Sequence, residues 1–138
     1  MICIEKIAHA GMLSLGAVVV ATLAMTGSAS AQQDGDMPLL NGCSSYVDAT
    51  AEDADRTLNW TYGVEEDARR CLKIRLGQTV TFDGSVSAHP IEALGGTTPN
   101  PFAGALSTST SFTFDAAGGF GFVCIFHEEM EGVIWVVA

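Results

Sequence analysis

Apolar residues recur at every second position through most of this chain after residue 31, and that period limits the folds open to it. In the run 57–62, Leu58, Trp60 and Tyr62 alternate with small polar residues. A strand points successive side chains to opposite faces of a sheet, whereas an amphipathic helix needs spacings of three and four. Further alternating runs lie at 71–76, 79–82, 111–114 and 120–126, and a continuous apolar run closes the chain at 133–137. We therefore expect five or six short strands and an all-β sandwich.

The segments between these runs have other compositions. Residues 65–70 are charged and predict a solvated turn. Residues 85–107 gather proline and glycine and predict a long loop, which holds His89. A loop of that length in a small domain is usually functional or disordered. Residues 43–55 are small and acidic, and they allow a short helix.

The first 31 residues predict an export signal. Lys6 precedes an apolar run from residue 11 to 25, and a small-x-small pattern at 29–31 suits cleavage. The alternative is a membrane anchor, but the run is short for a span and no stop-transfer pattern follows. We expect cleavage after residue 31, a flexible leader at 32–42 and one domain at 43–138. The product is then periplasmic or extracellular, without stable membrane insertion.

The balance of charge excludes some partners. Six lysines and arginines against 16 aspartates and glutamates leave a net charge of −10. Nucleic acid needs a basic surface, so we expect no nucleic-acid partner. An acidic surface can steer basic proteins toward the chain, although it also serves solubility alone. We expect a monomer.

Three cysteines follow residue 31, namely Cys43, Cys71 and Cys124. In an oxidising compartment two of them are expected to pair, and the odd one needs a reason. Cys124 lies among other metal donors, so Cys43–Cys71 is the economical pairing. Spacing alone does not decide connectivity, and the other pairings stay open.

A cluster of soft donors lies near the C-terminus. Cys124, His127 and Met130 fall within seven residues, and His89 is the only other histidine after residue 31. Taken singly, a thiol on an apolar strand or a methionine after a turn is more often packing material. Together they supply two imidazoles, a thiolate and a thioether, the donor set of a blue-copper electron-transfer site.

These residues resemble the cupredoxin family of blue copper proteins. Cys124-x-x-His127-x-x-Met130 is similar to the short ligand loop of amicyanin-type members, and the aromatic strand 120–124 looks like the one that precedes the family's cysteine. The resemblance covers roughly residues 71–138. It implies a Greek-key β-sandwich that holds one copper ion through His89, Cys124, His127 and Met130 and shuttles single electrons without being an enzyme.

The resemblance has two departures. The family usually has asparagine after its first histidine ligand, where this chain has Pro90, and proline before the second, where this chain has Phe126. Neither departure removes a ligand. Both change the groups around the ligands, which tune the reduction potential.

The family likeness also implies a docking surface around His127. We expect an apolar patch bordered by negative charge, formed by Phe126, Ile91 and Phe102 with Glu128, Glu129 and Glu131. Such a surface would suit a basic redox protein, such as a c-type cytochrome, an oxidase or a reductase, and its binding would weaken as salt rises. The glutamates could equally serve only to solvate the loop.

Other functions remain open from the residues. A structural zinc site could use Glu128 or Glu129 in place of Met130, because zinc rarely takes a thioether ligand. The same ligands could belong to a copper carrier or storage protein, and a metal-free sandwich could be a binding module. Two histidines are too few for the multinuclear copper centre of an oxidase, and no convincing nucleophile–base pair is present.

Overall fold

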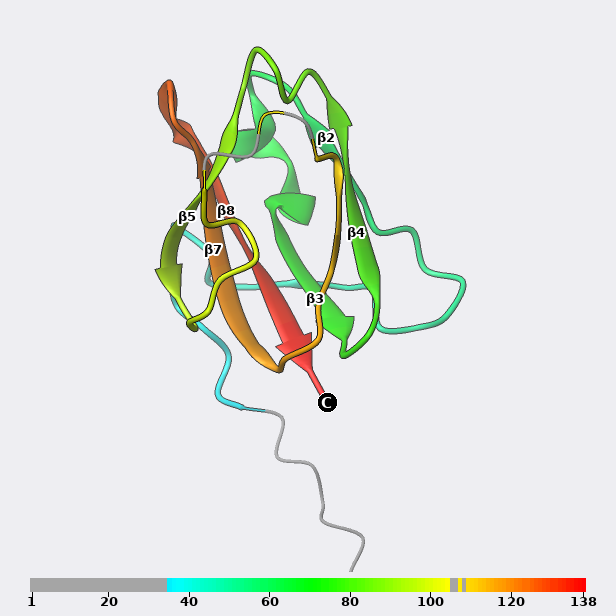
Figure 1. Cartoon of the computed structure of the whole chain (residues 1–138). Coiled ribbons are helices and arrows are strands. Elements are labelled where there is room, and N and C mark those ends of the chain that lie inside the picture. Colours follow the sequence, from blue (N-terminus) through cyan, green and yellow to red (C-terminus); the bar gives the residue numbers. More distant parts are fainter. Residues whose placement is uncertain (1–34, 105–106, 108) are drawn as a thin grey trace, which may run out of the picture. The chain divides into compact units, whose positions relative to one another are not determined.

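The computed structural model describes residues 35–104, 107 and 109–138 (Figure 1). The predicted export signal, residues 1–31, lies outside the described residues, as does the start of the leader. The first sheet has the strand order β1 (Val47–Asp48), β3 (Cys71–Arg75), β8 (His127–Val137), β7 (Gly118–Cys124) and β5 (Ile91–Gly96). The second sheet has the order β2 (Thr57–Trp60), β4 (Thr79–Gly84) and β6 (Ser111–Thr113). Two 3₁₀ turns, η1 (Val64–Glu66) and η2 (Ala68–Arg70), connect β2 to β3.

The predicted all-β sandwich is confirmed. The chain passes between the two sheets at almost every connection, and these crossings leave the pairs β1–β3, β3–β8 and β2–β4 parallel. The pairs β4–β6, β5–β7 and β7–β8 are antiparallel. In the described part of the chain, no helix has the length and apolar character needed to cross a bilayer.

Three local expectations differ from the structure. The predicted loop at 85–107 contains an edge strand, β5, whose two terminal glycines hide its strand character in the sequence. The predicted turn at 65–70 forms η1 and η2. No helix forms at 43–55, where the structure has β1 and turns. For β1 and β5, pairing with distant strands, which the local pattern does not show, decides the backbone.

Aromatic side chains fill the space between the sheets. Phe82 of β4 contacts Phe122 of β7 edge to face, with ring centroids 5.1 Å apart, and Trp60 of β2 packs against both. Such edge-to-face pairs stabilise beyond the area they bury. The buried aromatic residues are Trp60, Phe82, Phe102, Phe112, Phe114, Phe120 and Phe122. This aromatic cluster packs against β7, the strand that ends at Cys124.

Glycines allow close backbone approach on both faces of the larger sheet. A Cβ at Gly121 would overlap the carbonyl oxygen of Leu94, and one at Gly132 would overlap that of Arg70 and the ring of Phe122. Phe122 and Gly132 are paired across β7 and β8. Because glycine has no side chain, the backbone of Leu94 can lie close to Gly121 of β7, and the backbone of Arg70 can lie close to Gly132 of β8.

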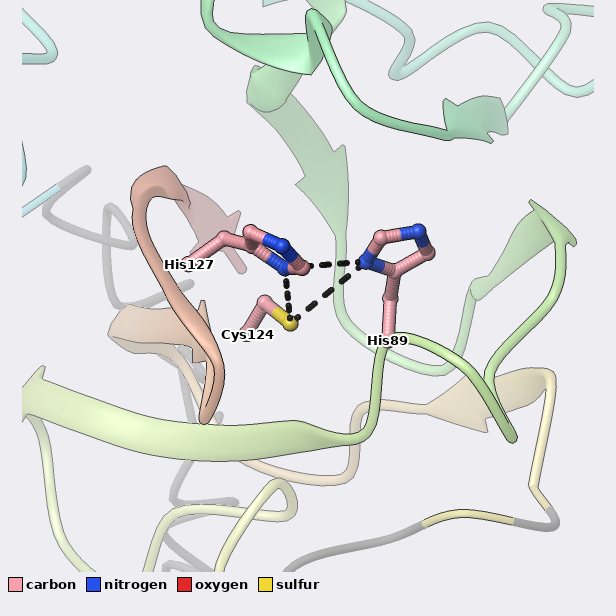
Figure 2. A group of neighbouring side chains, drawn as sticks. All are labelled: His89, Cys124 and His127. Atoms are coloured by element: carbon pink, nitrogen blue, oxygen red, sulfur yellow. Dashed lines mark hydrogen bonds between the residues drawn. The ribbon is translucent and has the colours of Figure 1, made fainter.

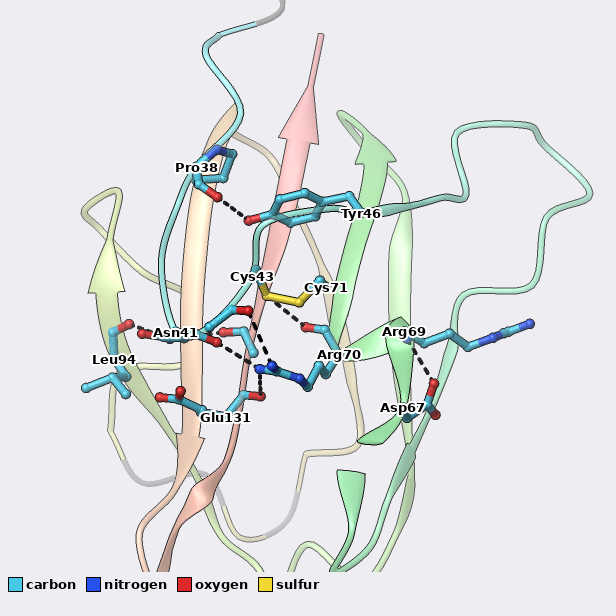
Figure 3. The surroundings of a disulfide bond; sticks show 12 residues. Pro38, Asn41, Cys43, Tyr46, Asp67, Arg69, Arg70, Cys71, Leu94 and Glu131 are labelled. Carbon is cyan, nitrogen blue, oxygen red and sulfur yellow. Dashed lines mark hydrogen bonds between the residues drawn. A yellow bond between two sulfur atoms is a disulfide. The ribbon is translucent and has the colours of Figure 1, made fainter. Parts of the chain in front are cut away.

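The N-terminal segment packs over the face of the larger sheet that carries Gly119 and Gly121 (Figure 3). Asn41 donates from its side chain to the carbonyls of Leu94 and Gly132, each at 3.0 Å. The Tyr46 hydroxyl donates to the carbonyl of Pro38 at 2.7 Å. The alternation pattern offers no reason to expect these contacts, because they involve single polar groups rather than a strand.

A disulfide and an arginine anchor the same segment. Cys43 and Cys71 are bonded, which confirms the predicted pairing. The Arg70 guanidinium donates to the carbonyls of Asn41, Glu131 and Gly42 at 2.8, 3.2 and 3.4 Å (Figure 3). The segment before β1 is thus held to β3 by the disulfide and to β8 through the Arg70 guanidinium.

Candidate metal centre

The thiol of Cys124 ends a strand and faces the core. Cys124 is the last residue of β7, is 2% exposed, and is the free cysteine of the described residues. Phe120 and Phe122 share its sheet face and are buried, as predicted, but Phe126 lies beyond the strand and is 66% exposed. The strand therefore buries a reduced thiol at one end of the sandwich.

Two imidazoles meet this thiol from different segments. His127 begins β8 and is paired with Cys124 across the tight β7–β8 turn. His89 lies just before β5, whose first residue, Ile91, is paired with Cys124 from the other side. The ligand atoms of the three residues all lie within 4.8 Å of one another. His89 and His127 lie on either side of the end of β7, and both turn their imidazole rings toward the Cys124 thiol (Figure 2).

The distances between the donor atoms show whether a metal ion could bind between them. The Nδ1 atoms of His89 and His127 are 3.2 Å apart, and Cys124 Sγ lies 3.8 Å from the first and 3.5 Å from the second. A point equidistant from the three atoms is about 2 Å from each, whereas Zn²⁺, for comparison, binds imidazole nitrogen at about 2.0–2.1 Å and thiolate at about 2.3 Å. The residues present therefore fit a transition-metal ion.

Met130 reaches the core from β8. Its side chain is fully buried and belongs to the same hydrophobic cluster as Cys124. It follows the alternation of β8, in which Met130, Ile134 and Val136 face that cluster. The structure thus places a thioether on the core side of the sheet that carries the thiol, and its role as a ligand remains a prediction.

Main-chain contacts tie the ligand segments together. The N–H of Ile125 donates to the carbonyl of Pro90 at 3.1 Å, and the N–H of His89 donates to the carbonyl of Ser85 at 2.9 Å. The indole N–H of Trp60 donates to the carbonyl of His89 at 2.7 Å. The alternation of its strand predicts that Trp60 is buried but carries no signal for this contact.

Tyr62 lies against the outer side of His127. The two rings meet edge to face with centroids 5.6 Å apart. The sequence predicts Tyr62 on a buried strand face, but β2 ends at Trp60 and Tyr62 is 65% exposed. Hydrogen bonding to the Glu129 carboxylate raises the pKa of Tyr62. The pKa of Glu129 is lowered, first by its own main-chain N–H and then by the Tyr62 hydroxyl.

The predicted apolar patch is wrong in two of its members. Ile91 and Phe102 are fully buried, because β5 and the segment after it pack into the aromatic core. The exposed apolar residues near His127 are instead Phe126, Ile125 and Tyr62. Glu128 and Glu129 are exposed, whereas Glu131 is partly buried beside Arg70.

No family model and no curated protein matches this sequence. Among solved structures, it is similar to a purple cupredoxin from Nitrosopumilus maritimus, with 27% identity over 47% of this chain and 75% of that chain, at a TM-score of 0.33. A reduced amicyanin mutant has 19% identity over 69% of this chain and 94% of its own, at a TM-score of 0.42. A copper-containing nitrite reductase from Thermus scotoductus SA-01 has 19% identity over 76% of this chain, which spans 26% of the reductase, at a TM-score of 0.45. The two-sheet sandwich and the gathering of His89, Cys124 and His127 agree with the resemblance that the sequence motif predicts, and the function proposed below rests on that geometry.

Proposed function

We propose that this chain is a small type 1 (blue) copper protein that carries single electrons between redox proteins. Its ligands are His89, Cys124, His127 and Met130. The supporting observation is the spacing of 3.2–3.8 Å between two imidazole nitrogens and one buried thiol, held by three separate pieces of the fold. We further propose that the protein acts as a monomer, without catalysing a reaction itself, after export to the periplasm or the cell exterior.

A copper ion bound here would supply one-electron exchange between its cuprous and cupric states. The chain's own residues hold the donor atoms nearly fixed. The hydrogen bond from Ile125 to Pro90 joins the two ligand segments, and the aromatic core supports β7 from below. A scaffold that does not rearrange between the two charge states keeps electron exchange fast. Burial of Cys124 also keeps water and oxidants from the thiol.

Burial favours an electron carrier over a copper carrier. Cys124 and Met130 are 2% and 0% exposed, so a partner protein could not reach either sulfur to take the ion by ligand exchange. Electrons need no such access. His127 is partly exposed beside Phe126, and an electron could pass through its ring to a docked partner. Zinc is disfavoured because, among the described residues, no carboxylate joins His89, Cys124 and His127 as a fourth ligand.

The docking surface is proposed to select a basic redox protein. Phe126, Ile125 and Tyr62 give an exposed apolar area, and Glu128 and Glu129 carry negative charge next to it. Charges at the rim of an interface mainly raise the association rate. The double variant Glu128→Gln/Glu129→Gln should slow reduction by a basic c-type cytochrome at low salt and approach the unmodified rate at high salt. A rate that does not depend on salt in either protein would contradict this docking surface.

Spectroscopy of the copper-loaded protein tests the function. The protein produced from the full chain is loaded with Cu(II), and its visible absorption and electron paramagnetic resonance are recorded. We expect an intense thiolate-to-copper charge-transfer band that Cys124→Ser abolishes. Met130→Leu should retain the band and shift the reduction potential, because an axial thioether tunes the potential more than it holds the ion. Absence of the band in the unmodified protein would refute the blue-copper proposal.

Voltammetry combined with the rate of copper loss distinguishes an electron carrier from a copper carrier. Rapid, reversible voltammetry with slow copper loss to a chelator supports electron transfer. Slow electron exchange with ready copper loss supports a copper carrier instead. Ser45→Ala is the matched control for Cys124→Ser and Met130→Leu, because Ser45 is an exposed residue before β1 that lies outside the donor group.

A further inference from the structure

A buried indole donor contacts the main chain of one ligand residue. Trp60 ends β2, in the smaller sheet, whereas His89 leads into β5 of the larger sheet. The Trp60 N–H donates to the His89 carbonyl at 2.7 Å, across 29 residues of sequence. Trp60 is fully buried. An indole N–H can only donate, and a buried donor without a partner costs about 1–3 kcal/mol.

The position of Trp60 leaves its ring little freedom. Phe82 and Phe122 meet the ring edge to face, at centroid distances of 5.4 and 5.7 Å. Its main chain is paired with Gly84 of β4, where an added Cβ would overlap the Trp60 carbonyl. The indole N–H therefore points to a place set by the aromatic core and by the β2–β4 pairing.

His89 has few other restraints on its main chain. Its N–H donates to the carbonyl of Ser85, and its neighbour Pro90 has no N–H to donate. The Pro90 carbonyl accepts from Ile125, which holds the residue after His89 but not the His89 peptide itself. The contact with Trp60 is thus the one that ties the His89 carbonyl to the core, among the contacts described.

We propose that Trp60 is a positioning residue of the metal centre. By holding the His89 peptide, it keeps the His89 Nδ1 aimed at Cys124 and His127. Its effect on copper rests on the proposed function, whereas its effect on the imidazole geometry exists in the metal-free protein. Loss of groups that orient metal ligands typically lowers metal affinity by about 10–100-fold.

Trp60→Phe tests this role, because it removes the donor and keeps an aromatic ring. The control is Phe112→Leu, which trims the same aromatic cluster through β6 and has no described contact with His89. Both variants should lower the free energy of unfolding. Trp60→Phe alone should weaken copper binding by about 10–100-fold and alter the cupric resonance spectrum. In the metal-free protein, it should also weaken the nuclear Overhauser effect between the His89 and His127 rings.

A second variant isolates the N–H. Replacing Trp60 alone by 3-benzothienylalanine exchanges the N–H for sulfur in a ring of nearly the same shape, so it serves if Trp60→Phe does not fold. Wild-type ring contacts and copper affinity in this variant would overturn the proposal. If the unmodified protein binds no copper, the proposed function fails, but the ring contacts of the metal-free variants still decide the role of Trp60.

Discussion

The main-chain N–H of Ile125 donates to the carbonyl of Pro90 at 3.1 Å, and this contact joins the two segments that carry the imidazoles. The neighbouring residues, Ile91 after Pro90 and Cys124 before Ile125, are paired across β5 and β7. The main chain of Cys124 and the two residues that follow His89 therefore belong to one ladder of main-chain contacts. The donor group is assembled by the sheet and does not need an ion to bring its segments together.

This preassembly predicts slow hydrogen exchange at Ile125 in the metal-free protein. An amide held in a ladder exchanges only when that part of the sheet opens. We expect Ile125 to be protected before copper is added, whereas the amide of Gly35, an exposed residue outside any strand and without a described hydrogen bond, serves as the reference. Amide exchange followed by nuclear magnetic resonance measures this. Protection that appears only after copper is added would show that the ion assembles the site.

Gly121→Ala should destabilise the fold because the new Cβ has no room. It would overlap the Leu94 carbonyl oxygen and the Asn41 side chain. Overpacking of this kind costs about 1–3 kcal/mol. Gly35→Ala, at a glycine with no neighbours within 4 Å, is the control and should leave stability unchanged. Urea unfolding of both variants checks this, and equal midpoints would contradict the close approach.

Arg70→Ala should release the N-terminal segment from β8. Its guanidinium donates to three carbonyls, two on that segment and one at Glu131. Hydrogen bonds from a charged donor contribute about 1.5–3 kcal/mol to stability. Arg70→Lys should recover only part of the loss, since lysine lacks the planar fork. Arg75→Ala, at an exposed arginine, is the control, and faster proteolysis before residue 43 in Arg70→Ala alone is the expected result.

The disulfide should contribute stability without forming part of the donor group. Cys43 and Cys71 close a loop of 28 residues and are buried. Cys43→Ala/Cys71→Ala should lower the free energy of unfolding by about 2–4 kcal/mol. Alkylation of the denatured, unreduced protein should label Cys124 and neither Cys43 nor Cys71. Labelling of all three would show that the pair does not form.

Tyr46 should make the fold sensitive to alkaline pH. Burial raises the pKa of Tyr46 to about 12, so the folded state favours the protonated hydroxyl that donates to Pro38. Its contribution is complete below the unfolded pKa of about 10 and is lost as pH rises toward 12. In Tyr46→Phe, stability should fall less steeply over this range. Urea unfolding at pH 9 and pH 11 compares the two slopes, and identical slopes would contradict the raised pKa.

Much of the fold and the donor set could be predicted from local patterns. Alternation identified most strands, because the faces of a sheet repeat every two residues whatever the partner strand. Strand β5 was missed, since its glycines break the alternation and only its pairing with β7 makes it a strand. Ile91 and Phe102 were placed wrongly on the surface for the same reason, because burial outside an alternating run depends on the neighbouring sheet.

The amino-acid sequence by itself determined most of the strand-forming segments and the chemical identity of the donors. Those properties depend on side-chain type and on spacing along the chain. Only the tertiary structure brought Trp60 to the His89 carbonyl, Tyr62 to His127 and Asn41 of the N-terminal segment to Gly132 of β8. Each of these contacts joins residues far apart in the sequence through a single hydrogen bond or ring edge. They are decided by the order of strands in the two sheets, which no local period encodes.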